Sequence, residues 1–128
     1  MIFKSILLGF MIFLVDLFAY GFYIFQIADL KEKKDILNKL KFTIPIGLFM
    51  QVFFALIFVF TFRFLAIFKA LNPSIGGGLY FSYIMFLPML YMLFNNMLWL
   101  DAKRSSTYLN IFVWGIKLAI CGVFTPLV

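Results

Sequence analysis

The fold of this chain is decided by residues 42–62, which read FTIPIGLFMQVFFALIFVFTF. This stretch has no charged side chain, and it has the length of about 20 mainly apolar residues that a helix needs to cross the hydrocarbon core of a bilayer. Three other stretches share this character: residues 70–100 have no charge, residues 5–28 have only Asp16, and residues 105–128 have only Lys117. The sequence therefore predicts a polytopic membrane protein with two ionisable groups inside the hydrocarbon.

The composition supports this prediction. The chain has 128 residues, of which 66% are hydrophobic, whereas a soluble globular domain has about 45–50% apolar residues. Backbone groups in lipid need partners within their own segment, so the spans are expected to be helices. We predict an all-α, integral membrane four-helix bundle with short loops, forming a single domain over residues 1–128. The spans, each of roughly 20 residues or more, are expected at about residues 5–28, 43–68, 77–100 and 108–127.

The residue types that are missing exclude several kinds of site. The chain has no His, which removes the commonest general base and the commonest transition-metal ligand. Its single cysteine, Cys121, excludes an intrachain disulfide and a Cys cluster for zinc or iron–sulfur. We therefore predict that the protein holds no metal and no cofactor.

The basic residues are concentrated in one short loop. Of the eleven Lys and Arg residues, five lie within residues 29–41, so the net charge of +6 indicates a lipid surface and not nucleic acid. These five are Lys31, Lys33, Lys34, Lys39 and Lys41. Leu30, Leu37 and Leu40 share one helical face in this loop, which is typical of an interfacial amphipathic helix. A solvated, charged turn explains the same residues, and both interpretations stay open.

The distribution of Lys and Arg predicts the orientation. The first and third loops together hold seven of these residues, and the opposite side holds three, Lys4, Arg63 and Lys69. The positive-inside rule therefore places the two basic loops in the cytoplasm and both termini outside. We expect the cell membrane, in particular a bacterial inner membrane. Arg63 lies at the outer end of the second span, from which its long side chain is expected to reach the interface.

Each predicted span carries polar or small residues at three- and four-residue spacing, on one helical face. The rows are Asp16, Tyr20 and Tyr23; Thr43, Gly47, Gln51 and Ala55; Tyr80, Tyr83, Tyr91 and Asn95; and Asn110, Trp114, Lys117 and Cys121. Because polar groups in lipid are costly, these faces are expected to turn inward. The candidates for a polar interior or substrate path are Tyr20, Tyr23, Gln51, Tyr83, Tyr91, Asn95, Asn110 and Trp114. The alternative role for these side chains is hydrogen bonding that joins the helices.

Asp16 and Lys117 are expected to form an intramembrane ion pair. Asp16 lies about 11 residues after the start of the first span and Lys117 about 10 residues before the end of the last, so both lie about 15–17 Å deep, near the midplane. An unpaired charge at that depth would cost at least ~2.5–3.5 kcal/mol. The pair is interpreted either as a pin that fixes the helices or as a proton- or ion-coupled site.

Several residues resemble one known group of proteins. They are Asp16 with Phe22 and Tyr23, Gly78 with Tyr80 and Tyr83, and Trp114 with Gly115. In this pattern the chain resembles small bacterial inner-membrane proteins that have four spans and no assigned function. That family carries an acid one turn before its Trp-Gly, where this chain has Asn110, and Lys117 is not expected from it. The resemblance implies a topology and no mechanism.

Three functions follow as hypotheses. The first is a transporter- or channel-type subunit, whose pathway would form between protomers because four helices enclose little volume. The second is a non-catalytic accessory or assembly subunit that binds a larger membrane protein. The third, a lipid-modifying enzyme, is favoured least, since Asp16 and Asp101 are the only acids outside the first loop. We therefore predict no enzymatic activity, and as partners the lipid bilayer and either a second copy or a larger membrane protein.

Overall fold

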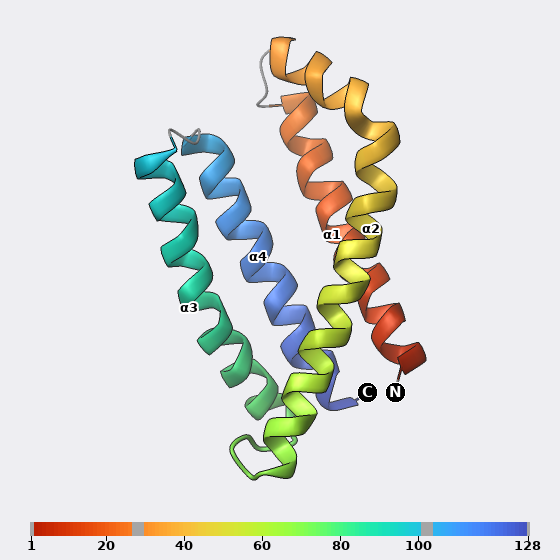
Figure 1. Cartoon of the computed structure of the whole chain (residues 1–128), viewed down its shortest axis with the longest axis vertical. Coiled ribbons are helices and arrows are strands. Elements are labelled where there is room, and N and C mark those ends of the chain that lie inside the picture. Colours follow the sequence, from red (N-terminus) through yellow and green to blue (C-terminus); the bar gives the residue numbers. More distant parts are fainter. Residues whose placement is uncertain (1, 27–29, 101–103, 128) are drawn as a thin grey trace. The chain divides into compact units, whose positions relative to one another are not determined.

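A computed structural model describes residues 2–26, 30–100 and 104–127. Over these residues the chain forms four long α-helices and one short 3₁₀ helix (Figure 1). They are α1 (Ile2–Gln26), α2 (Leu30–Ile67), α3 (Ile75–Trp99), α4 (Arg104–Phe124) and η1 (Thr125–Leu127). All four α-helices are long and apolar enough to cross a membrane. The predicted all-α class with four spanning helices is confirmed.

The chain divides into two compact units. Unit 1, Met1–Leu56, contains α1 and most of α2, and unit 2, Ile57–Val128, contains the end of α2 together with α3, α4 and η1. The single domain over residues 1–128 stays a prediction.

In unit 1, α1 and α2 come into close contact at Gly9. A Cβ atom built on Gly9 would lie 2.6 Å from the Cα of Val52, so no larger residue fits without moving one of the helices. Ser5, Leu8 and Ile12 are buried on the same face of α1 at spacings of three and four residues. Small residues at such contacts let the helix backbones pack closely, which is how helices associate in lipid.

The basic segment is helical from Leu30 onward, which excludes the solvated turn, and its location at a membrane interface stays a prediction. Helix α2 begins at Leu30 and runs without interruption into the second span, for 38 residues. At ~1.5 Å per residue it is about 57 Å long, against a hydrocarbon core of about 30 Å, so its charged first turns extend beyond the core. Its orange first part leans over the end of α1 (Figure 1). The Nζ atom of Lys33 lies 5.2 Å from the centroid of the Phe25 ring, which joins the two helices there.

In unit 2, α3 and α4 meet through small residues. A Cβ atom on Gly78 would overlap the carbonyl oxygen of Gly122, and a Cβ atom on Gly122 would overlap Ser82 Oγ. The Ser82 hydroxyl donates a hydrogen bond of 2.6 Å to the carbonyl oxygen of Leu118. The Gly-x-x-x-Ser spacing of Gly78 and Ser82 places both on one face, where the backbones approach and a polar group finds a partner inside the membrane.

The end of α2 packs on the start of α3 through aromatic rings. The Phe81 ring centroid lies 4.8 Å from that of Phe58 and 6.1 Å from that of Phe62, and all three side chains are buried. Ser74 caps α3, because its Oγ accepts a hydrogen bond of 3.2 Å from the Gly77 N–H. Helix α3 begins at Ile75, so Gly76, Gly77 and Gly78 belong to its first turn, with Gly77 and Gly78 on its buried face.

Candidate functional site

A cavity of about 530 Å³ lies inside unit 1, between α1 and the first half of α2. It begins at Phe13, one turn beyond the close contact at Gly9, and extends along α1 to Phe25. Residues between Ile36 and Gly47 form its opposite wall. The cavity exists because the helices touch at Gly9 and separate beyond it. Its volume falls within the range of about 300–1,000 Å³ that is usual for small-molecule sites.

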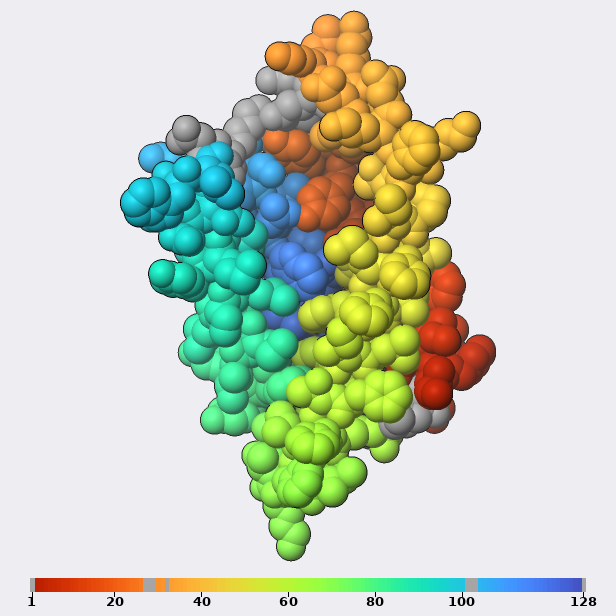
Figure 2. Space-filling model, in the orientation of Figure 1, coloured from red at the N-terminus to blue at the C-terminus, as the bar shows by residue number. Residues whose placement is uncertain are grey.

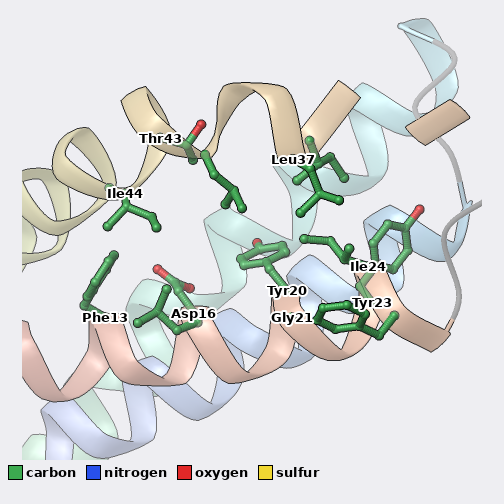
Figure 3. Close-up of a pocket in the computed structure, with 14 residues that line it drawn as sticks. Phe13, Asp16, Tyr20, Gly21, Tyr23, Ile24, Leu37, Thr43 and Ile44 are labelled. Carbon is green, nitrogen blue, oxygen red and sulfur yellow. The ribbon is translucent and has the colours of Figure 1, made fainter. Parts of the chain in front are cut away.

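The lining is mainly apolar and carries few polar groups. Figure 3 shows Asp16 and Tyr20 projecting from α1 toward α2, where Leu37 and Ile44 face them. Asp16 and Tyr20 are half-buried, and Tyr23 is buried. These three residues are four and three positions apart on α1, so they share the face that forms the cavity. The first predicted polar row thus lines this cavity, and the shared interior of all four rows stays a prediction.

The apolar face of the basic segment forms part of this cavity. Ile36, Leu37 and Leu40 line it, whereas an interfacial helix would place these side chains in lipid. In the structure these side chains face α1 instead, because α2 continues without a break and runs back alongside α1. Of the five lysines, Lys33 is half-buried and the rest are exposed: Lys31, Lys34, Lys39 and Lys41. Contact of these lysines with the lipid surface stays a prediction.

A carboxylate in an apolar cavity favours a ligand with a positive charge. Coulomb attraction is stronger in a medium of low dielectric constant than in water, so a cationic group near Asp16 gains more than it would at a surface. The apolar walls favour a ligand whose remaining surface is hydrophobic. Among the described residues no three His, Cys, Asp or Glu side chains lie together as metal ligands would. The arrangement suits an organic cation.

Lys117 lies in unit 2, on α4, and its side chain is only 2% exposed. Its Nζ atom lies 3.7 Å from the centroid of the Trp114 ring. A cation over the face of a Trp ring is stabilised by about 2 kcal/mol or more when it is shielded from water. The structure thus gives Trp114 a role that the sequence did not suggest, as an aromatic partner of the buried ammonium group. The ion pair of Lys117 with Asp16, a residue of unit 1, stays a prediction.

The third predicted polar row differs from the buried face of α3. Tyr80, Tyr83 and Tyr91 are 60%, 62% and 72% exposed, and Asn95 is exposed as well. The buried residues of α3 are Gly77, Gly78, Phe81 and Ser82. The side chains that are small enough for close contact with α4 lie on a different side of α3 from the tyrosines. Figure 2 shows the side of α3 that faces the viewer, coloured green to cyan. Gln51 on α2 and Asn110 on α4 are half-buried.

Comparisons of the chain with protein-family models, with curated proteins and with solved structures found no significant match. The resemblance to small four-span bacterial proteins therefore stays a prediction.

Proposed function

We propose that the protein is a transporter-type membrane subunit that binds an amphipathic organic cation in the cavity of unit 1. The observation that supports this proposal is the placement of Asp16 in an otherwise apolar space of about 530 Å³. The Lys and Arg distribution supports a location in the cell membrane with both termini outside. In that orientation the basic first part of α2 faces the cytoplasm, and the ligand would enter from that side.

The ligand class follows from the two kinds of contact that the cavity offers. The Asp16 carboxylate would hold a positive charge, and the Tyr20 hydroxyl would accept or donate one hydrogen bond beside it. Phe13, Leu37 and Ile44 would cover an apolar body. A small inorganic cation would leave these walls without contacts, and a neutral lipid would gain nothing from the negative charge of Asp16.

Asp16→Asn is expected to weaken binding of the aromatic cation tetraphenylphosphonium about tenfold. The substitution keeps the size of the side chain and removes the Coulomb attraction between the carboxylate and the phosphonium; a tenfold loss of affinity corresponds to about 1.4 kcal/mol. Equilibrium binding of the radiolabelled probe to the purified chain in detergent micelles measures this change. Asp35→Asn is the matched control, because Asp35 is exposed and does not line the cavity.

Triphenylphosphine oxide, which has a similar aromatic body and no net charge, is the control ligand. It is expected to bind weakly to the wild type and equally weakly to Asp16→Asn. Equal affinity of the wild type for the two probes, or unchanged cation binding in Asp16→Asn, would contradict the proposal.

A second candidate function is a subunit of a larger assembly, and the exposed polar row on α3 favours it. Tyr80, Tyr83, Tyr91 and Asn95 follow one face of a membrane helix, where polar groups in contact with lipid chains are costly. A second copy of the chain would cover this face and satisfy its hydroxyl and amide groups. Self-association through α3 also fits a transporter whose pathway runs between protomers.

Tyr83→Cys is expected to give a disulfide-linked dimer when membranes that contain the variant are oxidised. Two α3 helices that face each other would bring the introduced thiols together, and the native Cys121 is buried and does not compete. Met92→Cys is the control, since Met92 is exposed on α3 but lies about 180° around the helix from Tyr83. Gel electrophoresis without reductant measures the dimer. An equal yield from both variants, or none from either, would reject self-association through this face.

A further inference from the structure

A second cavity, of about 300 Å³, lies inside unit 2 where α2 ends. It is separate from the cavity that holds Asp16. Its lining comes from the last turns of α2, from the connection to α3 and from η1: Phe62, Arg63, Ala66, Ile67, Pro73, Thr125 and Pro126. Arg63 supplies the only charge among these residues.

Two polar atoms at this cavity are buried without a partner. Arg63 Nε and Thr125 Oγ1 make no hydrogen bond to any residue that the structure describes. The Thr125 side chain is fully buried, at 0% exposure. Buried donors are nearly always satisfied in folded proteins, because leaving one without a partner loses the hydrogen bond that it made with water. Two such groups at one cavity indicate a ligand that accepts hydrogen bonds from both.

The chemistry of the cavity selects an anion. A guanidinium group offers N–H donors in a planar fork that matches phosphate oxygens, and a threonine hydroxyl can donate to a further oxygen. Among the described residues that line the cavity there is no carboxylate to neutralise Arg63. A phosphate would satisfy the charge and both unpartnered donors together.

The position of the cavity indicates that this phosphate belongs to a lipid headgroup. Arg63 precedes the last residue of α2, Ile67, by four positions, so it lies about 6 Å from the helix end. Thr125 directly follows α4. Both residues thus lie near the ends of helices that are long and apolar enough to cross a membrane, where lipid headgroups are expected. Ile67 and the neighbouring Phe64 are largely exposed apolar side chains, along which an acyl chain would lie.

We infer that this cavity binds the headgroup phosphate of an anionic phospholipid. The Arg63 guanidinium and the Thr125 hydroxyl donate to the phosphate oxygens, and the fatty acyl chains follow the apolar end of α2. The lipid joins the end of α2 to η1, which lie 58 residues apart in the sequence when measured from Ile67 to Thr125.

Native mass spectrometry of the full chain, purified from vesicles with equal amounts of phosphatidylglycerol and phosphatidylcholine, tests this inference. The wild type is expected to retain phosphatidylglycerol in preference. Arg63→Gln is expected to reduce that retention about tenfold, and Thr125→Val severalfold. Arg104→Gln is the matched control, because Arg104 is exposed at the start of α4. If Arg63→Gln aggregates, Arg63→Lys is the alternative variant. It keeps the positive charge but lacks the planar, forked N–H donors of the guanidinium group, and it is expected to reduce phosphatidylglycerol retention severalfold.

Inorganic phosphate, titrated into delipidated protein while the thermal midpoint is followed, separates the two sources of the anion. No shift at millimolar phosphate is expected, since the free ion lacks the acyl contacts. A shift that disappears in Arg63→Gln, together with equal retention of the two lipids, would assign the cavity to free phosphate and overturn the lipid. Unchanged phosphatidylglycerol retention in both Arg63→Gln and Thr125→Val would overturn the site itself.

Discussion

Gly78→Ala is expected to lower the free energy of unfolding by about 3 kcal/mol, at the upper end of what overpacking usually costs. The added methyl group would overlap the carbonyl oxygen of Gly122, and this neighbour is backbone, which cannot rotate away. Helix α4 would have to shift, and the 2.6 Å hydrogen bond from Ser82 to the Leu118 carbonyl oxygen would lengthen with it. Titration of the purified chain from mild detergent into sodium dodecyl sulfate measures the change.

Gly76→Ala is the matched control for this variant. It adds the same methyl group two positions earlier on the same helix, where the nearest heavy atom is Ser74 Oγ at 3.8 Å, an ordinary contact distance. Alanine is also the better helix former by about 1 kcal/mol in a helix interior, so Gly76→Ala is expected to be neutral or mildly stabilising. Equal effects of the two substitutions would show that α3 and α4 do not meet at Gly78.

The sequence was sufficient for the four helices because the constraint that forms them is local. A run such as residues 42–62 needs only its own composition to indicate a span. The start of α2 was harder to predict, since a charged segment can form a turn or a helix with the same residues. The structure continues α2 back to Leu30, and contacts with α1, such as that of Lys33 with Phe25, accompany the extension.

The candidate site was predictable only in part, because polarity alone does not identify the buried face of a membrane helix. Polarity identified the Asp16, Tyr20 and Tyr23 face of α1, and that face does line a cavity. On α3 polarity selected the tyrosines, whereas the contact with α4 is made by Gly78 and Ser82. In lipid, close backbone approach decides which face is buried, so small residues are the better signal there. The cavity at Arg63 depends on residues far apart in the chain, and no local pattern indicates it.

Trp114→Leu is expected to lower the free energy of unfolding by about 3 kcal/mol in the wild type and by only about 1 kcal/mol in Lys117→Met. In the wild type the substitution removes both packing contacts and the aromatic face that lies 3.7 Å from the Lys117 ammonium group, and a buried cation that loses a partner is costly. Methionine keeps the length of the lysine without its charge, so only the packing loss remains. The coupling energy from this double-mutant cycle is therefore expected to be about 2 kcal/mol.

Trp99→Leu is the control for the loss of an indole ring, because Trp99 is 80% exposed at the end of α3 and is expected to change stability by less than about 0.5 kcal/mol. A coupling energy near zero for Trp114 and Lys117 would contradict the cation–π contact.

The same cycle with Asp16→Asn in place of Trp114→Leu tests the ion pair that we predict from sequence. Since either single substitution would leave one buried charge without its partner, the double variant should be more stable than the two single losses added together. Strict additivity of the two losses would reject the pair.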